Sequence, residues 1–183
     1  FNKALPSGTL AGVINGGKTK TDVVFTFDST KYFASVKKDG QDYATNYNGE
    51  LYFFATDLSS GYYTVRLTRL TDAENYTDYT FLINTLAPEF NLSIAEGTTT
   101  NKSVIVTWTA SDIETVTYTL NGGEVIQLQN GAVMSDDGEY TVVAMNDLGT
   151  QSVKIFAIDK TLDYDILIGD KQRRPFAYRQ SKY

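Results

Sequence analysis

The chain has 183 residues, 16 of them basic and 22 acidic, and a formal net charge of −6 at pH 7. It contains no cysteine and no histidine, which excludes disulfides, Cys/His zinc sites, thiol nucleophiles and imidazole bases. An acidic chain also argues against nucleic acid as the main partner, because phosphate binding requires a basic face. No stretch reaches the roughly 20 apolar residues of a transmembrane segment. Since the sequence begins with Phe1 rather than Met, we expect a piece of a longer protein.

Composition and periodicity predict strands. Threonine and aromatic residues are abundant, and both fit a pleated, half-buried surface. Apolar residues alternate over 23–28, 104–109 and 116–120, which predicts short antiparallel strands. Turn signals containing glycine separate such runs at 39–40, 48–49, 121–123, 130–131 and 137–138. No window has the spacing of an amphipathic helix, so the predicted fold class is all-β.

The sequence repeats itself once with a period near 80 residues. Gly61–Val65 matches Gly138–Val142 in four of five positions, and Phe81–Asn84 corresponds to Phe156–Asp159. The offset between the copies is 81 or 82 early in the chain, then 77, then 75, so the first copy carries longer loops. We therefore predict three segments: a first β-sandwich over 1–86, a second over 87–161, and a C-terminal extension over 162–183.

The run Asp137–Ala144 resembles the part of immunoglobulin-like (Ig-like) domains that carries the tyrosine corner. Val142 stands where a disulfide-bonded domain would have its second cysteine, and the resemblance is to the cysteine-free Ig-like domains repeated in bacterial surface proteins. It implies two tandem Ig-like antiparallel β-sandwiches. It also implies that Tyr63 and Tyr140 are buried corner tyrosines. The alternation of Val104, Val106 and Trp108 as one buried face predicts that Trp108 is a core residue rather than a ligand platform.

Catalysis is not expected. We predict no catalytic residue, no cofactor and no metal. A calcium ion near Asp159, Asp163 and Asp165 is the open alternative, but ordinary turn and surface aspartates explain this cluster better. Internal Lys–Asn cross-links occur in some surface repeats of this class, and Lys154 and Lys160 give no specific signal for one.

Two asymmetries suggest where a ligand could bind. Residues 1–86 hold 15 aromatics against five in 87–160, and Tyr43, Tyr47 and Tyr62 are expected to be exposed. Exposed tyrosines offer flat contact area for a sugar or a protein, although a plain Tyr-rich strand surface is the simpler explanation. Residues 1–160 carry a net charge of −8, whereas 161–183 carry +2. Arg173 and Arg174 lie in this basic tail, which is either a plain extension or an arm for an acidic partner.

The function expected from these features is non-catalytic adhesion or spacing in a bacterial extracellular protein, at the cell surface or secreted. Its partner would be a cell-surface protein, a glycan, or neighbouring domains of the same longer chain. An alternative is a set of accessory repeats, with a polysaccharide as ligand, in a larger secreted enzyme. A third hypothesis is that the chain belongs to a virion appendage.

Overall fold

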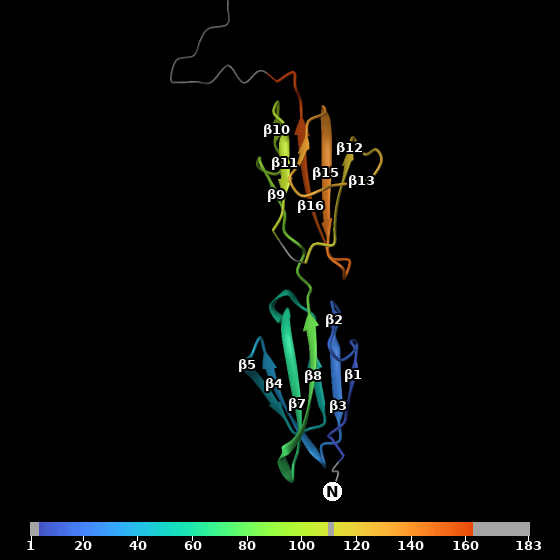
Figure 1. Cartoon of the computed structure of the whole chain (residues 1–183), viewed down its shortest axis with the longest axis vertical. Helices are drawn as coiled ribbons and strands as arrows, with labels where there is room; N and C mark the ends of the chain where they lie inside the picture. Colours follow the sequence, from blue (N-terminus) through green and yellow to red (C-terminus); the bar gives the residue numbers. More distant parts are fainter. Residues whose placement is uncertain (1–3, 110–111, 163–183) are drawn as a thin grey trace, which may run out of the picture. The chain divides into compact units, whose positions relative to one another are not determined.

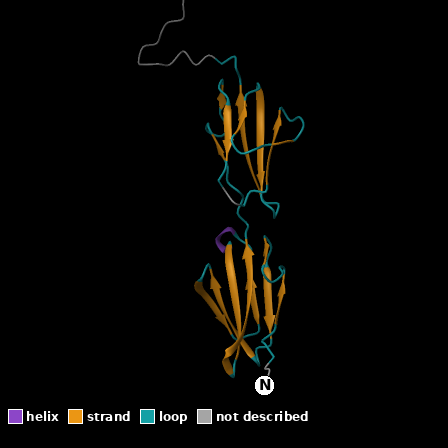
Figure 2. Ribbon diagram, in the orientation of Figure 1, coloured by secondary structure: helices purple, strands orange, loops and turns teal. Residues whose placement is uncertain are grey.

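The computed structural model describes residues 4–109 and 112–162, and within these ranges the chain consists of strands, turns and a single 3-10 turn (Figures 1 and 2). The all-β prediction is therefore confirmed. The chain divides into two compact units that change over between Ala87 and Pro88, and the loop Asn146–Thr150 is grouped with the first. Arg173 and Arg174 lie outside the described residues.

The first unit is a sandwich of two sheets. One sheet has three strands in the order β1–β3–β6, and the other has five in the order β2–β8–β7–β4–β5. The strands are β1 (Gly8–Ala11), β2 (Gly17–Thr19), β3 (Val23–Phe27), β4 (Tyr32–Lys38), β5 (Gln41–Asn46), β6 (Glu50–Phe53), β7 (Gly61–Arg69) and β8 (Asp72–Ile83), with the 3-10 turn η1 (Asp57–Ser59) between β6 and β7.

The second unit repeats this arrangement. Its three-stranded sheet has the order β14–β11–β9, and its five-stranded sheet has the order β10–β16–β15–β12–β13. The strands are β9 (Asn91–Leu92), β10 (Thr99–Thr100), β11 (Val104–Thr107), β12 (Thr115–Leu120), β13 (Ile126–Gln127), β14 (Ala132–Met134), β15 (Gly138–Met145) and β16 (Gln151–Ile158). In both units one short strand, β2 or β10, pairs in parallel with the last strand, while the other pairings are antiparallel.

Each sandwich is held together by residues that alternate inward from both sheets. Because successive side chains of a strand point to opposite faces, one face of each sheet contributes to a core between the layers. The buried core of the first unit consists of Val23, Phe25, Ala34, Val36, Leu51, Phe53, Tyr63, Val65, Leu67, Phe81 and Ile83. That of the second consists of Phe90, Val104, Val106, Val116, Leu128, Met134, Tyr140, Val142, Ala144, Phe156 and Ile158. No disulfide is present, so packing and hydrogen bonds stabilise both units.

Strand register locates the difference in length between the copies. Phe53 pairs with Val23 and Met134 pairs with Val104, so the offset is still 81 at the end of β6 and β14. It is 77 at Gly61 and Gly138, where the next strands begin. The four extra residues of the first unit therefore lie in the connection from β6 to β7. This connection spans 54–60 in the first unit and only 135–137 in the second.

A matched turn ties the central strands of each sandwich together. Asp39 and Asn121 adopt left-handed backbone conformations, with φ of 50° and 52°. The side chain of Asp39 accepts a hydrogen bond from the backbone N–H of Tyr62, and that of Asn121 from the N–H of Glu139. A Cβ atom on Gly138 would lie 2.6 Å from the Asn121 side chain, so glycine is required beside this hydrogen bond. These turns are the Asp-Gly and Asn-Gly signals of the sequence.

Candidate functional site

The three tyrosines predicted to bind a ligand are exposed, but they have different neighbours. Tyr47 stacks on Phe33, with ring centroids 5.2 Å apart. Tyr62 lies on β7 beside Leu82 of β8. Tyr43 meets the buried ring of Tyr63 edge-on at 5.7 Å. We therefore do not treat the three as one patch.

An irregularity in β5 separates Tyr43 from the others. Strict alternation would place Tyr43 and Tyr47 on the same face of the sheet. The register between β4 and β5 shifts between Val36 and Lys37, so that Ala44 pairs with Val36 and Asp42 with Lys37. A bulge of this kind leaves one residue outside the ladder and redirects its side chain. Here that residue is Tyr43, and its ring lies against the core tyrosine Tyr63.

Tyr43 lines a shallow cavity of about 250 Å³ in the first sandwich, which we call the aromatic cleft. The residues that line it are Lys38, Tyr43, Tyr52, Phe53, Phe54, Thr56, Leu58, Ser59 and Tyr63. They come from β4, β5, β6, β7 and the connection between β6 and β7. The extra residues of the first copy thus form part of the wall of this cleft.

Two parallel rings form one side of the aromatic cleft. Leu51 and Phe53 of β6 point into the core, so Tyr52 points outward, and the ring of Phe54 lies beside it. Their centroids are 6.3 Å apart and their planes differ by only 13°. Tyr52 is 57% exposed and Phe54 is 65% exposed. The sequence prediction did not include this pair, although alternation along β6 would have placed Tyr52 outward.

Hydrogen bonds hold the wall of the cleft. The Lys38 ammonium donates to the carbonyl of Leu58 at 2.7 Å. The hydroxyl of Ser59 donates to the carbonyl of Phe54, and the hydroxyl of Tyr63 donates to the carbonyl of Ser59 at 2.7 Å. These bonds fix a loop whose Leu58 side chain is 93% exposed. Leu58 thereby adds an exposed apolar side chain to those of Tyr52 and Phe54 in the lining of the cleft.

Tyr63 and Tyr140 occupy equivalent places in the two cores. Tyr63 stacks on Phe81 at 5.3 Å and Tyr140 stacks on Phe156 at 4.9 Å. Each hydroxyl bonds to the backbone four residues earlier: Tyr63 donates to Ser59, and Tyr140 donates to the carbonyl of Asp136 at 3.0 Å. Burial raises the pKa of Tyr63 to about 12 and is also the main cause of the raised pKa of Tyr140. This geometry is that of a tyrosine corner.

Trp108 lies one residue beyond the end of β11. It is partly buried and packs against the core of the second sandwich. Its backbone N–H donates to the Asn130 side chain at 3.0 Å, and its carbonyl accepts from the same amide at 2.8 Å.

Asp159 and Lys154, two of the groups considered for a metal or a cross-link, have ordinary partners. Asp159 accepts hydrogen bonds from the backbone N–H and the hydroxyl of Thr161, as a turn aspartate does. Asp163 and Asp165 lie outside the described residues. Over 4–109 and 112–162, no group of three or more carboxylate, histidine or cysteine side chains is placed to hold a metal. The Lys154 ammonium donates to the Phe90 carbonyl at 2.7 Å.

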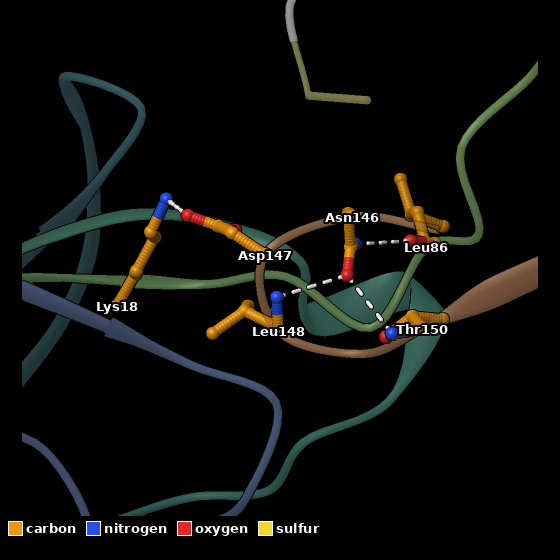
Figure 3. Close-up of polar contacts among 6 residues, drawn as sticks. All are labelled: Lys18, Leu86, Asn146, Asp147, Leu148 and Thr150. Atoms are coloured by element: carbon orange, nitrogen blue, oxygen red, sulfur yellow. Dashed lines mark hydrogen bonds and ion pairs between the residues drawn. The ribbon is translucent and has the colours of Figure 1, made fainter. Parts of the chain in front are cut away.

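A separate polar cluster belongs to the first compact unit and centres on Asn146, which is fully buried (Figure 3). Its side-chain oxygen accepts from the N–H groups of Leu148 and Thr150, and its NH₂ group donates to the Leu86 carbonyl at 3.4 Å. Asp147 of the same loop forms an ion pair with Lys18. A buried amide whose donor and acceptor are both engaged is a structural element rather than a free binding group.

The second sandwich has no equivalent of the aromatic cleft among its described residues. Strand register places Val133 at the position of Tyr52, and the same offsets continued one residue beyond the paired strands put Val125 and Ser135 at the positions of Tyr43 and Phe54. Over the part of the chain that the structure describes, every strongly exposed aromatic side chain belongs to the first unit. These are Tyr43, Tyr47, Tyr52, Phe54, Tyr62 and Tyr76.

The sheet order, the parallel pairing of the second strand with the last and the corner tyrosine define the class: the chain is a tandem pair of Ig-like β-sandwiches. No helix in the described ranges is long and apolar enough to cross a membrane.

No protein-family model and no curated protein matches the sequence. Solved structures with a similar arrangement include DIP-gamma IG1+IG2, at 13% identity over 84% of this chain and 97% of that one, with a TM-score of 0.46. Murine CEACAM1b is 18% identical over 84% of this chain and 99% of its own, with a TM-score of 0.37. The fibronectin(III)-like modules of CbhA from Clostridium thermocellum are 13% identical over 86% and 97%, with a TM-score of 0.33. The fold assignment rests on the strand pairing of this chain itself.

Proposed function

We propose that this chain is a non-catalytic extracellular binding module in which the first sandwich carries the ligand site and the second acts as a spacer. One observation carries the proposal. Two sandwiches of the same topology differ in their surfaces, and the exposed aromatic side chains and the aromatic cleft belong to the first. Rigid rings on a preorganised loop supply contact area at a low entropic cost, which suits them to binding.

The setting we propose is the surface of a bacterial cell, with adhesion as the task. Ig-like sandwiches without cysteine are suited to display outside the cell in repeated arrays, and the absence of histidine from the sequence favours binding over acid–base chemistry. Within the proposal Tyr43 contributes to the cleft, whereas Tyr47 and Tyr62 belong to the neighbouring surface. Arg173 and Arg174 would provide a second, electrostatic contact.

A labelled sample of the full chain, applied to purified bacterial cell walls and to immobilised host extracellular matrix, tests the proposal. We expect saturable binding to at least one of these surfaces. The double variant Tyr52→Ala/Phe54→Ala should weaken it at least tenfold. The matched double variant Val133→Ala/Ser135→Ala, at the equivalent positions of the second sandwich, should bind like the unmodified chain. Absence of binding to either surface, or equal binding by all three proteins, would contradict the proposal.

The alternative function is that of accessory repeats in a larger secreted enzyme, with the same cleft binding the polysaccharide. The sequence that flanks this chain in its gene distinguishes the two roles. A hydrolase domain on the same polypeptide would favour the accessory role, and a wall-anchoring segment with further repeats would favour adhesion.

A further inference from the structure

We infer that the aromatic cleft binds a neutral polysaccharide chain, with sugar rings lying flat on Tyr52 and Phe54. This inference rests on the proposed function and names the ligand class of its site. The two rings are nearly parallel, with centroids 6.3 Å apart, and both residues are more than half exposed, so one ligand can reach both. The C–H face of a pyranose is apolar and its hydroxyls lie around its edge. An aromatic platform with polar groups at its margin therefore matches both parts of a sugar.

Polar groups that can orient sugar hydroxyls surround the platform. The Glu50 carboxylate lies on the same exposed face of β6 as Tyr52, two residues earlier, and its interaction with the phenol is the main cause of the raised pKa of Tyr52. Tyr43 and Thr56 bring further hydroxyl groups to the lining. A carboxylate and a phenol on one strand face provide acceptor and donor positions for sugar hydroxyls.

The charge of the first sandwich argues against a polyanion as the preferred ligand. Residues 1–87 contain eight basic and nine acidic residues, a net charge of −1. Lys38 is the one charged residue among those that line the described cleft, and its ammonium already donates to the Leu58 carbonyl. Single-stranded nucleic acids also stack on aromatic platforms, but they require a positively charged groove along their backbone. A neutral chain needs no such groove.

The edge of β6 is closed to an added peptide strand. A peptide that extends a sheet forms main-chain hydrogen bonds along an unpaired edge. On the free edge of β6 the Asn46 side chain donates to the carbonyl of Glu50 at 3.0 Å. Beyond the end of β6 the Ser59 hydroxyl occupies the carbonyl of Phe54. Two carbonyls that an incoming strand would need are therefore already bonded, and recognition is left to the side chains of the cleft.

Affinity electrophoresis of the full 183-residue chain tests this inference. The probes are three neutral polysaccharides, hydroxyethylcellulose, arabinoxylan and galactomannan, and one polyanion, polygalacturonate. We expect retardation by at least one neutral polysaccharide and no stronger retardation by polygalacturonate. Tyr52→Ala and Phe54→Ala should each raise the apparent Kd at least tenfold. Both side chains are exposed, so neither variant should disturb folding, and circular dichroism checks this.

Val133→Ala and Ser135→Ala are the matched controls, because they alter the equivalent positions of the second sandwich. Both should be retarded like the unmodified chain. Failure of all three neutral probes, stronger retardation by polygalacturonate, or equal retardation of the cleft and control variants would overturn the inference.

Treatment of the bound surface separates this inference from the proposed function. Periodate destroys sugar diols, whereas a protease removes protein partners. If a surface binds the chain through Tyr52 and Phe54, we expect periodate to abolish that binding and protease to leave it. The reverse result would show that the module binds a protein, which overturns the glycan assignment and leaves the proposed function standing. Absence of binding to every untreated surface would contradict the proposed function itself.

Discussion

The two sandwiches share their sheet topology and core and differ in their surface residues. Sheet topology and the stacked pair formed by the corner tyrosine and a phenylalanine are the same in both. The surfaces differ: the second unit places Val125, Val133 and Ser135 where the first has Tyr43, Tyr52 and Phe54. The difference shows that the repeated core supplies the scaffold, and that a four-residue extension and an edge-strand bulge create the candidate site.

Charge is also divided unequally. Residues 88–160 contain ten acidic and three basic residues, a net charge of −7, whereas residues 1–87 are close to neutral. A strongly acidic surface favours solubility and discourages nonspecific association. The nearly neutral surface is the one that carries the exposed rings, as expected for a site that binds an uncharged ligand.

The shared cores predict the largest effects. Phe81→Ala and Phe156→Ala remove equivalent fully buried rings, and each should lower the free energy of unfolding of its own sandwich by about 3–5 kcal/mol. Trp108 is the only tryptophan and packs in the second sandwich. Its fluorescence during urea unfolding should therefore shift for Phe156→Ala, while the far-UV transition of the first unit shifts for Phe81→Ala. A shift of the Trp108 transition by Phe81→Ala would show that the units do not unfold independently.

The corner hydroxyls distinguish the copies on a smaller scale. The Tyr140 hydroxyl both donates to the Asp136 carbonyl and accepts from its N–H, whereas Tyr63 bonds to the Ser59 carbonyl. We expect Tyr140→Phe to cost about 2 kcal/mol and Tyr63→Phe about 1 kcal/mol, measured by urea unfolding. Tyr63→Phe should also weaken ligand binding, because its partner Ser59 lies in the cleft wall. Unchanged stability in both variants would show that the hydroxyl hydrogen bonds of the corner tyrosines do not stabilise the sandwiches.

The loss of stability at alkaline pH provides a second test of the buried Tyr63 hydroxyl. A phenol whose pKa rises on folding stabilises the protein below its unfolded pKa, near 10, and that contribution disappears as the pH passes the folded value, about 12 for Tyr63. The Tm of the first sandwich should fall between these pH values, and less steeply in Tyr63→Phe.

Much of this shared fold was predictable from sequence. Alternation located β3 and β11, and the Asp-Gly and Asn-Gly pairs located the turns at 39–40 and 121–122. These are local signals, since a strand has period two and a left-handed turn favours Gly, Asn or Asp. The cleft was not predicted, because it depends on long-range placement. The bulge that turns Tyr43 toward Tyr63 depends on pairing with β4, and no local pattern in the sequence indicates it.

The left-handed turn residues predict an effect of about 1 kcal/mol in each copy. Asp39→Ala and Asn121→Ala remove a side-chain acceptor and place alanine at positive φ. Asp39→Asn and Asn121→Asp, which keep the acceptor and tolerate this conformation, should change the free energy of unfolding much less. Equal loss in the alanine and the exchanged variants, measured by urea unfolding, would show that the hydrogen bond does not stabilise these turns.

The smallest expected effect concerns one turn motif that occurs at different places in the two sandwiches. Asp28 and Asp159 each accept hydrogen bonds from the N–H and the hydroxyl of a threonine two residues later. Only Asp28 also has a lysine partner, Lys31 at 2.8 Å. Lys31, and then Thr30, lower the pKa of Asp28 from its usual 3.8 to about 2, whereas Thr161 lowers that of Asp159.

Because the folded pKa of Asp28 lies below the unfolded value, its contribution to stability is present above about pH 4 and is lost as the pH falls through about 2. Lys31→Gln should raise the pKa of Asp28, measured by ¹³C NMR titration of the carboxyl group, and leave that of Asp159 unchanged. The site is exposed, so stability at neutral pH should hardly change. An unchanged pKa of Asp28 in Lys31→Gln would assign the whole shift to the threonine turn and make the two motifs electrostatically equivalent.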